Sequence, residues 1–554
     1  MSLGDTIDRV FPLATYRKYQ KETIAKIISY WASGKKYVVL QAPTGTGKSV
    51  VGYTAAQVYL DLFGVPKEKD SPASTAIVHT RALQAQYGKS LQLPLLWSSR
   101  HYDCALMPGE GLHFGDIQCS GPTCLVYDQC DYANAKTRYK NAMVGCTNVS
   151  YFINADTILP QVLVCDEAHK LEHILCDQFS FKINLKEWKR HITTLRTNKV
   201  GNWRAADLWL NIQELFYIDA TVDEWLTPSL LKIINQIYRF VTEFSLELAS
   251  YMEILKADFN PRAMSSAKKQ QYRDLSSATA FLKEIERPLY SFRSNPLDYV
   301  PLKIVKDEEE ITVFKPLHAQ AFSLPFFGRT NRVLLMSATI LGHDVFTKNL
   351  GIDEKDYAYI EVPSTFPKEN RPIHVMTNLG AFTFKTRDTV LPKFAAVIDR
   401  IIDTQFKDVR GIIHSVSFEN ADFIVKNSRH AHRMIVPQTE DLLEIEELMR
   451  KNNNTILVGP SLVEGLDLKD SLSRFIIWLK VPYLSLGDRW VTTRMNENQD
   501  WYIREAALQF VQGSGRSMRH EEDHCVTITI DDMFSELLRS GKRFLPDWFM
   551  EAIK

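Results

Sequence analysis

Short apolar runs followed by polar turns and amphipathic stretches recur in two parts of the chain. In the first part, strands are predicted at 37–40, 75–79, 142–146, 162–165 and 332–336. In the second part, they are predicted at 373–376, 411–415, 455–459, 475–479 and 526–530. Short apolar runs are typical of buried strands, and strands that alternate with helices indicate a parallel sheet. The pattern therefore predicts two α/β domains.

Between these arrays, at about residues 181–320, the pattern changes to that of long helices. Apolar residues recur at three- and four-residue steps over 230–252 and 264–285, and 302–305 with 311–314 suggests a hairpin around an acidic turn. We predict an inserted helical module. The first part of this module contains Trp188 and Trp203 among seven basic residues. These residues either line a strand of nucleic acid or form a solvated helix face. The basic residues are Lys182, Lys186, Lys189, Arg190, Arg196, Lys199 and Arg204.

Composition changes this picture little. A length of 554 residues predicts two or more domains. Lys+Arg and Asp+Glu are both 66, so net charge gives no sign of a nucleic-acid partner and any basic surface must be local. Asp5, Asp8 and Arg9 argue against a secretion signal, and no apolar run is long enough to cross a bilayer. We expect a cytoplasmic protein with no membrane association, whose eight cysteines serve metal binding or core packing before disulfides.

The strand at 37–40 leads into a turn that suits phosphate binding. Glycines there let backbone N–H groups point inward, and the following helix, from Lys48 to about Phe63, adds a partial positive charge at its N-terminus. Lys48 can reach the β- and γ-phosphates and the Ser49 hydroxyl can bind Mg²⁺. Ala42 occupies the first position of the usual motif. The sequence predicts an ATP site whose loop contains Thr44, Gly45, Thr46, Gly47, Lys48 and Ser49.

Two more stretches extend this predicted site. Upstream, Gln20 can present its amide to the adenine edge, and Arg17 can lie near the nucleotide. Downstream, Asp166, Glu167 and His169 follow the strand at 162–165, where an α/β sheet places metal-binding and catalytic carboxylates.

We expect Asp166 to hold Mg²⁺, commonly through water, and Glu167 to orient and deprotonate the attacking water. His169 would sense the γ-phosphate. The hydroxyls of Ser337 and Thr339 follow the strand at 332–336 and suit a hydrogen-bond relay between the two domains, with a helix cap as the alternative.

Four cysteines lie within a glycine-rich segment that has little core of its own: Cys104, Cys119, Cys124 and Cys130. Thiolates of this kind hold an iron–sulfur cluster or Zn²⁺. Structural zinc sites usually have a close cysteine pair in each half, whereas the spacing C-x₁₄-C-x₄-C-x₅-C has only one such pair. The spacing therefore favours a cluster over zinc, with unrelated thiols as a third possibility. Four other cysteines are expected in the core: Cys146, Cys165, Cys176 and Cys525.

In the second array, Arg516 and Arg519 lie three residues apart on an expected helix, so both can face one direction. Two guanidinium groups directed at a nucleotide on the other domain form an arginine-finger arrangement. The alternative is an arginine pair that forms salt bridges with nearby acidic residues, namely Glu521, Glu522 and Asp523.

The motifs occur in the order YRKYQ, APTGTGKS, TRALQAQ, four cysteines, DEAH, helical insert, SAT, EGLD and QGSGRSMR. In this order the chain resembles, over almost its whole length, the superfamily-two DNA helicases of the DinG/XPD iron–sulfur group. The cysteine spacing, the stretch at 131–136 and the stretch at 480–486 are more similar to DinG. The resemblance implies ATP and Mg²⁺, with Asp467 and Gln512 near the nucleotide, and a [4Fe–4S] cluster on the four cysteines.

The resemblance also implies a fold and partners. The fold is α/β, with two RecA-like motor domains, an inserted iron–sulfur domain and a helical arch. Translocation would run 5′→3′ on single-stranded DNA and separate forked duplex DNA, in a protein expected to be monomeric. We assign the first motor domain to 1–97, 138–180 and 321–345, the iron–sulfur domain to 98–137, the arch to 181–320 and the second motor domain to 346–554.

Some features leave alternatives open. Asn148 is followed by Val149, where family members usually carry histidine. The chain also begins almost at the first motif, so we expect the N-terminal exonuclease of some DinG relatives to be absent. A double-strand translocase, an RNA or RNA–DNA hybrid helicase, and an ATP-gated nucleic-acid-binding scaffold remain rival functions.

Overall fold

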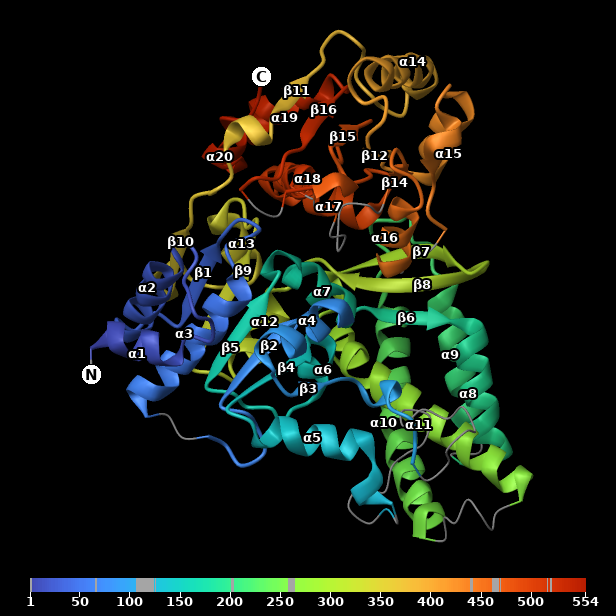
Figure 1. Ribbon diagram of the computed structural model, residues 1–554. Helices are drawn as coiled ribbons and strands as arrows, with labels where there is room; N and C mark the ends of the chain where they lie inside the picture. The colour runs from blue at the N-terminus through green and yellow to red at the C-terminus, as the bar shows by residue number, and fades with distance from the viewer. Residues whose placement is uncertain are drawn as a thin grey trace.

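The computed structural model describes residues 2–554, except for 65–66, 106–123, 125, 201–203, 258–264, 439–441, 461–467, 469, 516 and 519–520. The chain forms two lobes, each built on a parallel sheet, and an insert of long helices (Figure 1). Lobe 1 lies at the left of the view, lobe 2 at the top and the insert at the lower right. No described helix is both long and apolar enough for a membrane span.

The lobe 1 sheet has seven strands in the order β10-β1-β9-β5-β2-β4-β3, and all of its pairings are parallel. All five predicted strands are present, each within two residues of the expected bounds. The strands are β1 (Tyr37–Gln41), β2 (Ser74–Val78), β3 (Leu95–Leu96), β4 (Val144–Asn148), β5 (Val162–Asp166), β9 (Arg332–Ser337) and β10 (Tyr357–Glu361).

The lobe 2 sheet has six strands in the order β11-β16-β15-β12-β14-β13, again all parallel. The five predicted strands are again present, and β13 is added at one edge. The strands are β11 (Ile373–Val375), β12 (Gly411–His414), β13 (Met434–Ile435), β14 (Ile456–Gly459), β15 (Phe475–Trp478) and β16 (Val526–Thr529).

The two sheets share one topology. When the five main strands of each lobe are numbered along the chain, both sheets read 1-5-4-2-3: β1-β9-β5-β2-β4 in lobe 1 and β11-β16-β15-β12-β14 in lobe 2. The predicted α/β class and the two RecA-like lobes are therefore confirmed.

Helices cover both faces of each sheet. In lobe 1 they are α1 (Leu3–Val10), α2 (Gln20–Ala32), α3 (Lys48–Phe63), α4 (Arg81–Leu91), α5 (Asp131–Asn141), α6 (Val149–Asn154), α7 (Leu171–Gln178), α12 (Gln320–Phe327) and α13 (His343–Asn349). In lobe 2 they are α14 (Arg387–Gln405), α15 (Phe418–Asn427), α16 (Leu442–Arg450), α17 (Arg489–Glu497), α18 (Gln499–Ser514), α19 (Met533–Gly541) and α20 (Asp547–Met550).

Three hydrophobic clusters form the core. One contains Val38 and lies with α2 and α3 on one face of the lobe 1 sheet, and another contains Ile413 and lies with α14 on one face of the lobe 2 sheet. The third and largest includes Leu163 of lobe 1, Ile237 of the insert and Trp478 of lobe 2. The apolar interior is thus continuous through lobe 1, the insert and lobe 2, so the two lobes meet along a shared hydrophobic core.

The insert begins at β6 (Phe181–Asn184) and continues through α8 (Leu185–Thr197), α9 (Arg204–Phe216), α10 (Pro228–Ala257) and α11 (Ser266–Ser294) to β7 (Tyr299–Lys306) and β8 (Glu309–Pro316). The predicted hairpin is confirmed, and β6 joins it in an antiparallel sheet of order β6-β8-β7. Trp188 is 1% exposed and packs edge-on against Phe281 at 5.0 Å between ring centroids, so it belongs to the core rather than to a base-stacking surface. Trp203 lies outside the described residues.

The boundary between the two motor domains differs from the prediction. The predicted end of lobe 1 is residue 345, but β10 returns to lobe 1 and pairs in parallel with β1, from Tyr37 opposite Tyr357 to Gln41 opposite Glu361. The backbone N–H of Val362 still donates to the Gln41 carbonyl at 2.9 Å. Lobe 1 therefore extends to about residue 362, because the connection to lobe 2 contributes an edge strand to its sheet.

Candidate nucleotide site between the lobes

The phosphate loop has the backbone that its sequence predicts. Gly45 and Gly47 have φ of +84° and +76°, a left-handed conformation that glycine adopts without steric cost. The Thr46 hydroxyl donates to the Pro43 carbonyl at 2.8 Å and closes the turn. Helix α3 then begins at Lys48, so its free N–H groups and the Lys48 amine lie at the same end. This is the geometry of an anion-binding site. Ser49, the next residue, places its hydroxyl at the same end of the helix.

Arg17 and Gln20 bind the loop itself. The Arg17 guanidinium donates to the Gly45 carbonyl, and the Gln20 amide nitrogen donates to the Thr46 carbonyl at 2.9 Å. Gln20 is 2% exposed, and a Cβ at Gly47 would lie only 2.4 Å from its amide nitrogen. Both ends of the Gln20 amide are thus bonded to backbone atoms, of Arg17 and Thr46, and its contact with adenine stays a prediction.

Asp166 and Ser49 form the part of the site that suits Mg²⁺. The Ser49 hydroxyl lies 3.3 Å from Asp166 Oδ2, which also accepts a hydrogen bond from the Tyr87 hydroxyl at 2.7 Å. Burial, and secondarily the neighbouring Glu167, raises the pKa of Asp166 to about 6, although Lys48 acts in the opposite direction. Carboxylate and hydroxyl oxygens are the ligands that Mg²⁺ prefers, and a bound cation would favour the ionised carboxylate. The residues present thus fit the predicted cofactor.

Glu167 occupies a strained position directly after β5. Its φ is +51°, which is uncommon for a residue other than glycine and is often found at functional sites. Its Oε2 accepts a hydrogen bond from the Ser337 hydroxyl at 3.2 Å and lies 3.4 Å from His169 Nδ1. The carboxylate is therefore oriented by residues from two adjacent strand ends, β5 and β9.

A hydrogen-bond chain runs from this carboxylate into lobe 2. Gln512, near the end of α18, contacts His169 Nε2 and Thr339 Oγ1 through its amide nitrogen, both at 2.8 Å. Because an amide nitrogen only donates, His169 Nε2 must accept, and the His169 proton lies on Nδ1. Nδ1 then donates to the Ser337 hydroxyl at 2.8 Å, which donates to Glu167. The predicted relay through Ser337 and Thr339 is confirmed.

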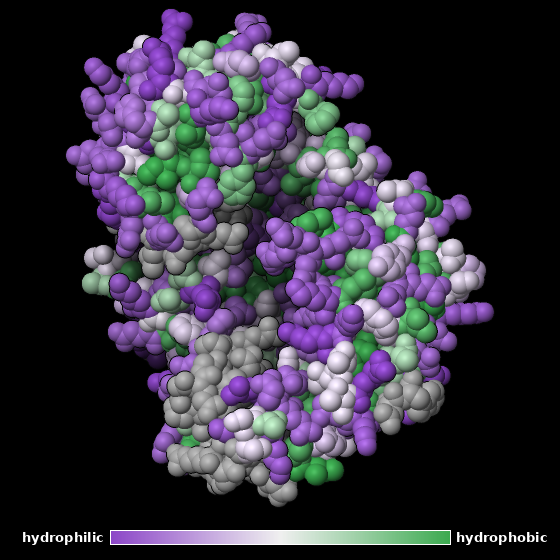
Figure 2. Space-filling view, turned by 90° about the vertical axis from the view of Figure 1, so that its right-hand side faces the viewer, coloured by the Kyte–Doolittle hydropathy of each residue, from purple (hydrophilic) through white to green (hydrophobic). Residues whose placement is uncertain are grey.

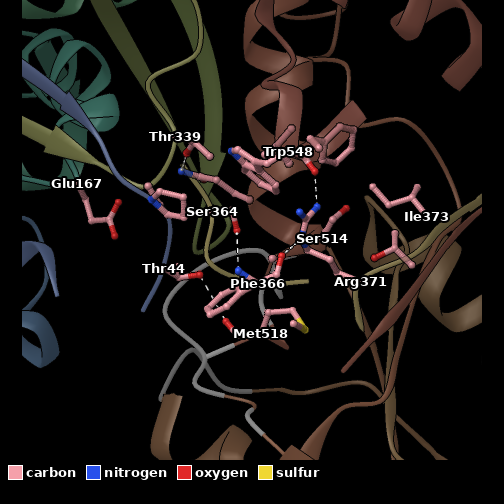
Figure 3. A pocket seen from close by; sticks show the side chains of 17 residues that line it. Thr44, Glu167, Thr339, Ser364, Phe366, Arg371, Ile373, Ser514, Met518 and Trp548 are labelled. Atoms are coloured by element: carbon pink, nitrogen blue, oxygen red, sulfur yellow. Dashed lines mark hydrogen bonds between the residues drawn. The ribbon is translucent and has the colours of Figure 1, made fainter. Parts of the chain in front are cut away.

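A pocket opens where the lobes meet (Figure 3). Thr44 and Glu167 line it from lobe 1, and Gln512, Ser514 and Met518 line it from lobe 2. The Thr44 hydroxyl donates to the Met518 carbonyl at 3.4 Å, which brings the segment after α18 onto the phosphate loop. The nucleotide-binding side of lobe 1 is therefore completed by lobe 2.

The far wall of this pocket is built around Arg371, which the sequence did not indicate. Its guanidinium donates to the carbonyls of Phe366, at 3.1 Å, and Trp548, and to the Glu551 carboxylate at 2.6 Å. These bonds attach the segment between the lobes to the C-terminal helix α20. No local pattern marks such a residue, because two of its three partners, Trp548 and Glu551, lie 177 and 180 positions along the chain.

Three residues predicted for the site lie outside the described residues: Asp467, Arg516 and Arg519. Helix α18 ends at Ser514, so the helix expected to carry both arginines ends before the first of them. Met518, one residue before Arg519, nevertheless contacts the phosphate loop through its carbonyl. The sequence also missed Tyr87, whose hydroxyl binds Asp166, since nothing in the pattern of α4 distinguishes it from a core tyrosine.

The cysteines divide into two groups. Cys146, Cys165, Cys176 and Cys525 are buried, as predicted, and burial raises the pKa of each thiol. Of the predicted cluster ligands, Cys130 is buried before α5, Cys104 and Cys124 are partly exposed, and Cys119 lies outside the described residues. Within the described ranges, no three His, Cys, Asp or Glu side chains come together as a metal site. These residues alone do not assemble a cluster site.

Sequence comparisons match both lobes. Residues 13–198 match the family described as "Type III restriction enzyme, res subunit", and residues 411–552 match "Helicase C-terminal domain". A relative named "3'-5' exonuclease DinG" from Staphylococcus aureus (strain USA300) is 19% identical in an alignment 460 residues long, which covers 72% of this chain and 50% of the relative. One of the same name from Staphylococcus haemolyticus is 22% identical over 216 residues, covering 36% of this chain and 24% of that protein. The chain thus spans about half the length, or less, of these relatives.

Solved structures match the whole arrangement. "XPD_Helicase" aligns with a TM-score of 0.62 at 17% identity and covers 96% of this chain and 98% of its own. "Structure of S. tokodaii Xpd4" aligns with a TM-score of 0.59 at 15% identity, and the alignment covers 97% of this chain and 99% of that structure's chain. The chain therefore shares the overall fold of these two proteins. Together with the DinG relatives and the two domain matches, these structures make the chain similar to helicases of the DinG/XPD-like group.

Proposed function

We propose that this protein is an ATP-dependent DNA helicase that translocates 5′→3′ on single-stranded DNA and separates forked duplexes. One observation carries the proposal: an unbroken hydrogen-bond chain joins Gln512 of lobe 2 to Glu167, next to the phosphate loop of lobe 1. A site that is complete only when two lobes meet suits hydrolysis that drives their relative motion.

In the proposed mechanism, ATP binds with its phosphates on the loop before α3, within reach of Lys48. Ser49 and Asp166 are the residues that would hold Mg²⁺. The metal ion would neutralise charge that develops on the phosphates. Glu167 orients the attacking water and accepts its proton. Arg516 and Arg519 approach the γ-phosphate from lobe 2, an arrangement supported by the contact of Met518 with Thr44.

The hydrogen-bond chain gives His169 a defined role. With its proton on Nδ1, His169 orients the Ser337 hydroxyl toward Glu167 and offers Nε2 to Gln512. When the lobes separate, Gln512 leaves, and Nε2 loses its partner. His169 therefore links the position of lobe 2 to the orientation of the catalytic carboxylate. The γ-phosphate contact predicted for His169 is part of the same proposal.

Energetics favour a motor over passive binding. DNA stacking averages about 1.4 kcal/mol per base-pair step. Capture of one freed base on an aromatic side chain gains about 1–3 kcal/mol. Because these values nearly balance, binding alone can open an end but cannot advance repeatedly, and each step requires ATP hydrolysis to reset the contacts.

The decisive experiment measures ATP hydrolysis with single-stranded DNA, duplex DNA and RNA, and strand separation on duplexes with a 5′ or a 3′ tail. We expect the largest stimulation by single-stranded DNA and separation of the 5′-tailed substrate. Preferential stimulation by RNA, or separation of RNA–DNA hybrids only, would replace the DNA assignment. Binding without hydrolysis would indicate an ATP-gated scaffold. Gel filtration in the same buffer tests the expected monomer.

We also propose that Cys104, Cys119, Cys124 and Cys130 bind a [4Fe–4S] cluster, on the strength of their spacing and the family. Anaerobic purification should yield a brown protein with about four irons. Cys119→Ser should lose the iron, while Cys176→Ser, a change in the core, should keep it. Stoichiometric zinc in a colourless protein would assign the site to Zn²⁺ instead.

A further inference from the structure

The insert contacts both lobes, although the chain enters and leaves it through lobe 1. On the lobe 1 side, Arg287 of α11 donates to the Ile153 carbonyl and to the Asp156 carboxylate at 2.9 and 3.1 Å. This contact anchors α11 to the end of α6. Since the insert is also joined to lobe 1 by covalent connections, this anchor alone would make the insert a passive extension of lobe 1.

A second anchor reaches the insert from lobe 2. Arg489, the first residue of α17, donates to the Ala220 and Val222 carbonyls, the latter at 2.8 Å, and to the Asp223 carboxylate at 3.0 Å. These acceptors belong to the α9–α10 loop (217–227), which is part of the insert. The two anchors have the same chemistry, a guanidinium group on backbone carbonyl oxygen and an exposed aspartate, but they belong to different lobes.

Helices α17 and α18 carry the second anchor toward the nucleotide site. Only Asn498 separates them, and Trp490 of α17 packs edge-on against Trp501 of α18 at 5.5 Å between ring centroids. Helix α18 has 16 residues and is therefore about 24 Å long. At its start, the α17–α18 pair contacts the insert through Arg489. Near its end, it contacts His169 of lobe 1 through Gln512.

The middle of the α17–α18 pair is fixed to lobe 1 by buried charges. Arg494 bonds to Glu172 of α7 at 2.5 Å, and both side chains are 2% exposed. Glu505 contacts His173 of α7 at 2.9 Å. Although burial acts in the opposite direction, His173 and Arg504 lower the pKa of Glu505 to about 2, so this carboxylate stays charged.

The three contact regions differ in how easily they break. Separating a buried, charged pair leaves an uncompensated charge inside the protein, whereas the Gln512 bond is between neutral groups. The Arg489 side chain is 23% exposed and Asp223 is fully exposed, so water can replace that contact. The region of Glu172 and His173, named here the pivot, is therefore the contact hardest to break. One arm of the α17–α18 pair extends from it to Gln512 and the other to Arg489.

We propose that Arg489 is a coupling residue: movement of Gln512 during the ATP cycle turns the α17–α18 pair about its buried pivot, and Arg489 transmits this movement to the α9–α10 loop of the insert. A hollow lies between lobe 2 and the insert on the face shown in Figure 2, so the two surfaces are not packed together throughout. The insert would then change position with each hydrolysis step. This inference rests on the proposed ATP-driven function.

The test compares Arg489→Ala with Arg287→Ala, the matched change in the lobe 1 anchor. Hydrogen exchange of the peptide 217–227 is measured with ADP and with a non-hydrolysable ATP analogue, together with base pairs separated per ATP hydrolysed. We expect the wild-type peptide to exchange differently with the two nucleotides and Arg489→Ala to abolish the difference. Arg489→Ala should retain DNA-stimulated ATP hydrolysis but separate at least about fivefold fewer base pairs per ATP.

Arg287→Ala should keep the nucleotide-dependent exchange, and Arg489→Lys, which retains one donor group, should restore part of the coupling. Equal exchange with both nucleotides in the wild-type protein would overturn the proposal. So would an Arg489→Ala variant that separates as many base pairs per ATP as the wild type. Absence of ATP hydrolysis in the wild-type protein would instead refute the proposed function, which keeps the two failures distinct.

Discussion

The two lobes have the same strand order (Figure 1), but they place different residues at corresponding strand ends. In lobe 1 the first main strand leads into the phosphate loop and the fourth ends at Asp166. In lobe 2 the first main strand, β11, leads into the 376–386 loop, and the fourth, β15, leads to Lys480. The shared backbone arrangement therefore does not by itself define a nucleotide site. Such a site depends on which side chains follow the first and fourth main strands.

Two buried aspartates show the difference most clearly. Asp166 in lobe 1 bonds to two hydroxyl groups and one backbone N–H, so part of its coordination can pass to a metal ion. Asp531, two residues after β16 in lobe 2, accepts backbone N–H donors from Phe382, Val481 and Met533. Its bonds fix three loops of lobe 2. The bonds of Asp166 are compatible with the Mg²⁺ that we propose it holds, whereas the bonds of Asp531 serve the fold, and lobe 2 lines the pocket through the end of α18 instead.

The largest effect should come from removing the Lys48 amine, which we propose binds phosphate. Lys48→Ala should lower kcat for ATP hydrolysis by about 10³-fold or more, because a charge that stabilises the transferring phosphoryl group is lost. Lys480→Ala removes a lysine near the strand ends of lobe 2 and should leave basal hydrolysis unchanged. Steady-state kinetics of both variants measure this, and comparable losses would mean that lobe 2 also binds nucleotide.

The next effect concerns the charge pair that joins the lobes. Arg494→Met leaves Glu172 buried without its partner and should destabilise the protein by roughly 3–5 kcal/mol. Thermal unfolding measures the loss. Glu172→Met combined with Arg494→Met removes both charges and should recover much of it. If the double variant is as unstable as the single one, shape rather than charge holds this interface together.

Asp166 predicts an unusual dependence of stability on pH. Its pKa of about 6 lies above the ordinary 3.8, so the folded state favours the protonated acid, and this contribution is lost as pH rises from about 4 through 6. Without Mg²⁺, Asp166→Asn should therefore be more stable than the wild type at pH 8, by about 2–3 kcal/mol, and equal to it near pH 4. Melting temperatures across this range measure the difference, and Mg²⁺ should reduce it. A variant that is less stable at pH 8 would contradict this reading of the site.

The smallest effect should come from the contact between the lobes at His169. Gln512→Ala removes the donor to His169 Nε2 and should lower kcat about tenfold, the equivalent of one hydrogen bond to a catalytic relay. The KM for ATP should change little, because the contact does not touch the phosphate loop. Gln509→Ala, the same substitution three residues earlier on α18 and outside the pocket lining, is the matched control. Equal kinetics for both variants would remove the relay from the mechanism.

Much of the fold was predictable because it is encoded locally. Buried strands need apolar runs, so ten strands were found within two residues of their bounds, and the start of α3 at Lys48 follows from the glycines before it. The acidic pair after β5 and the hydroxyls after β9 were found for the same reason. Parallel strands bring their carboxyl ends to one edge, which turns separate motifs into a site.

The remainder depended on partners that are distant in the sequence. β10 joins lobe 1 through pairing with β1, more than 300 residues away, and Gln20 turns to the phosphate loop rather than outward. Arg494 and Glu172 are 322 positions apart, and neither has a local pattern that marks it as buried. Sequence therefore determined which segments become strands, helices and ligand-binding turns, since those depend on neighbours along the chain. Tertiary structure alone decided which charges are buried in pairs, because desolvation is set by whatever packs around them.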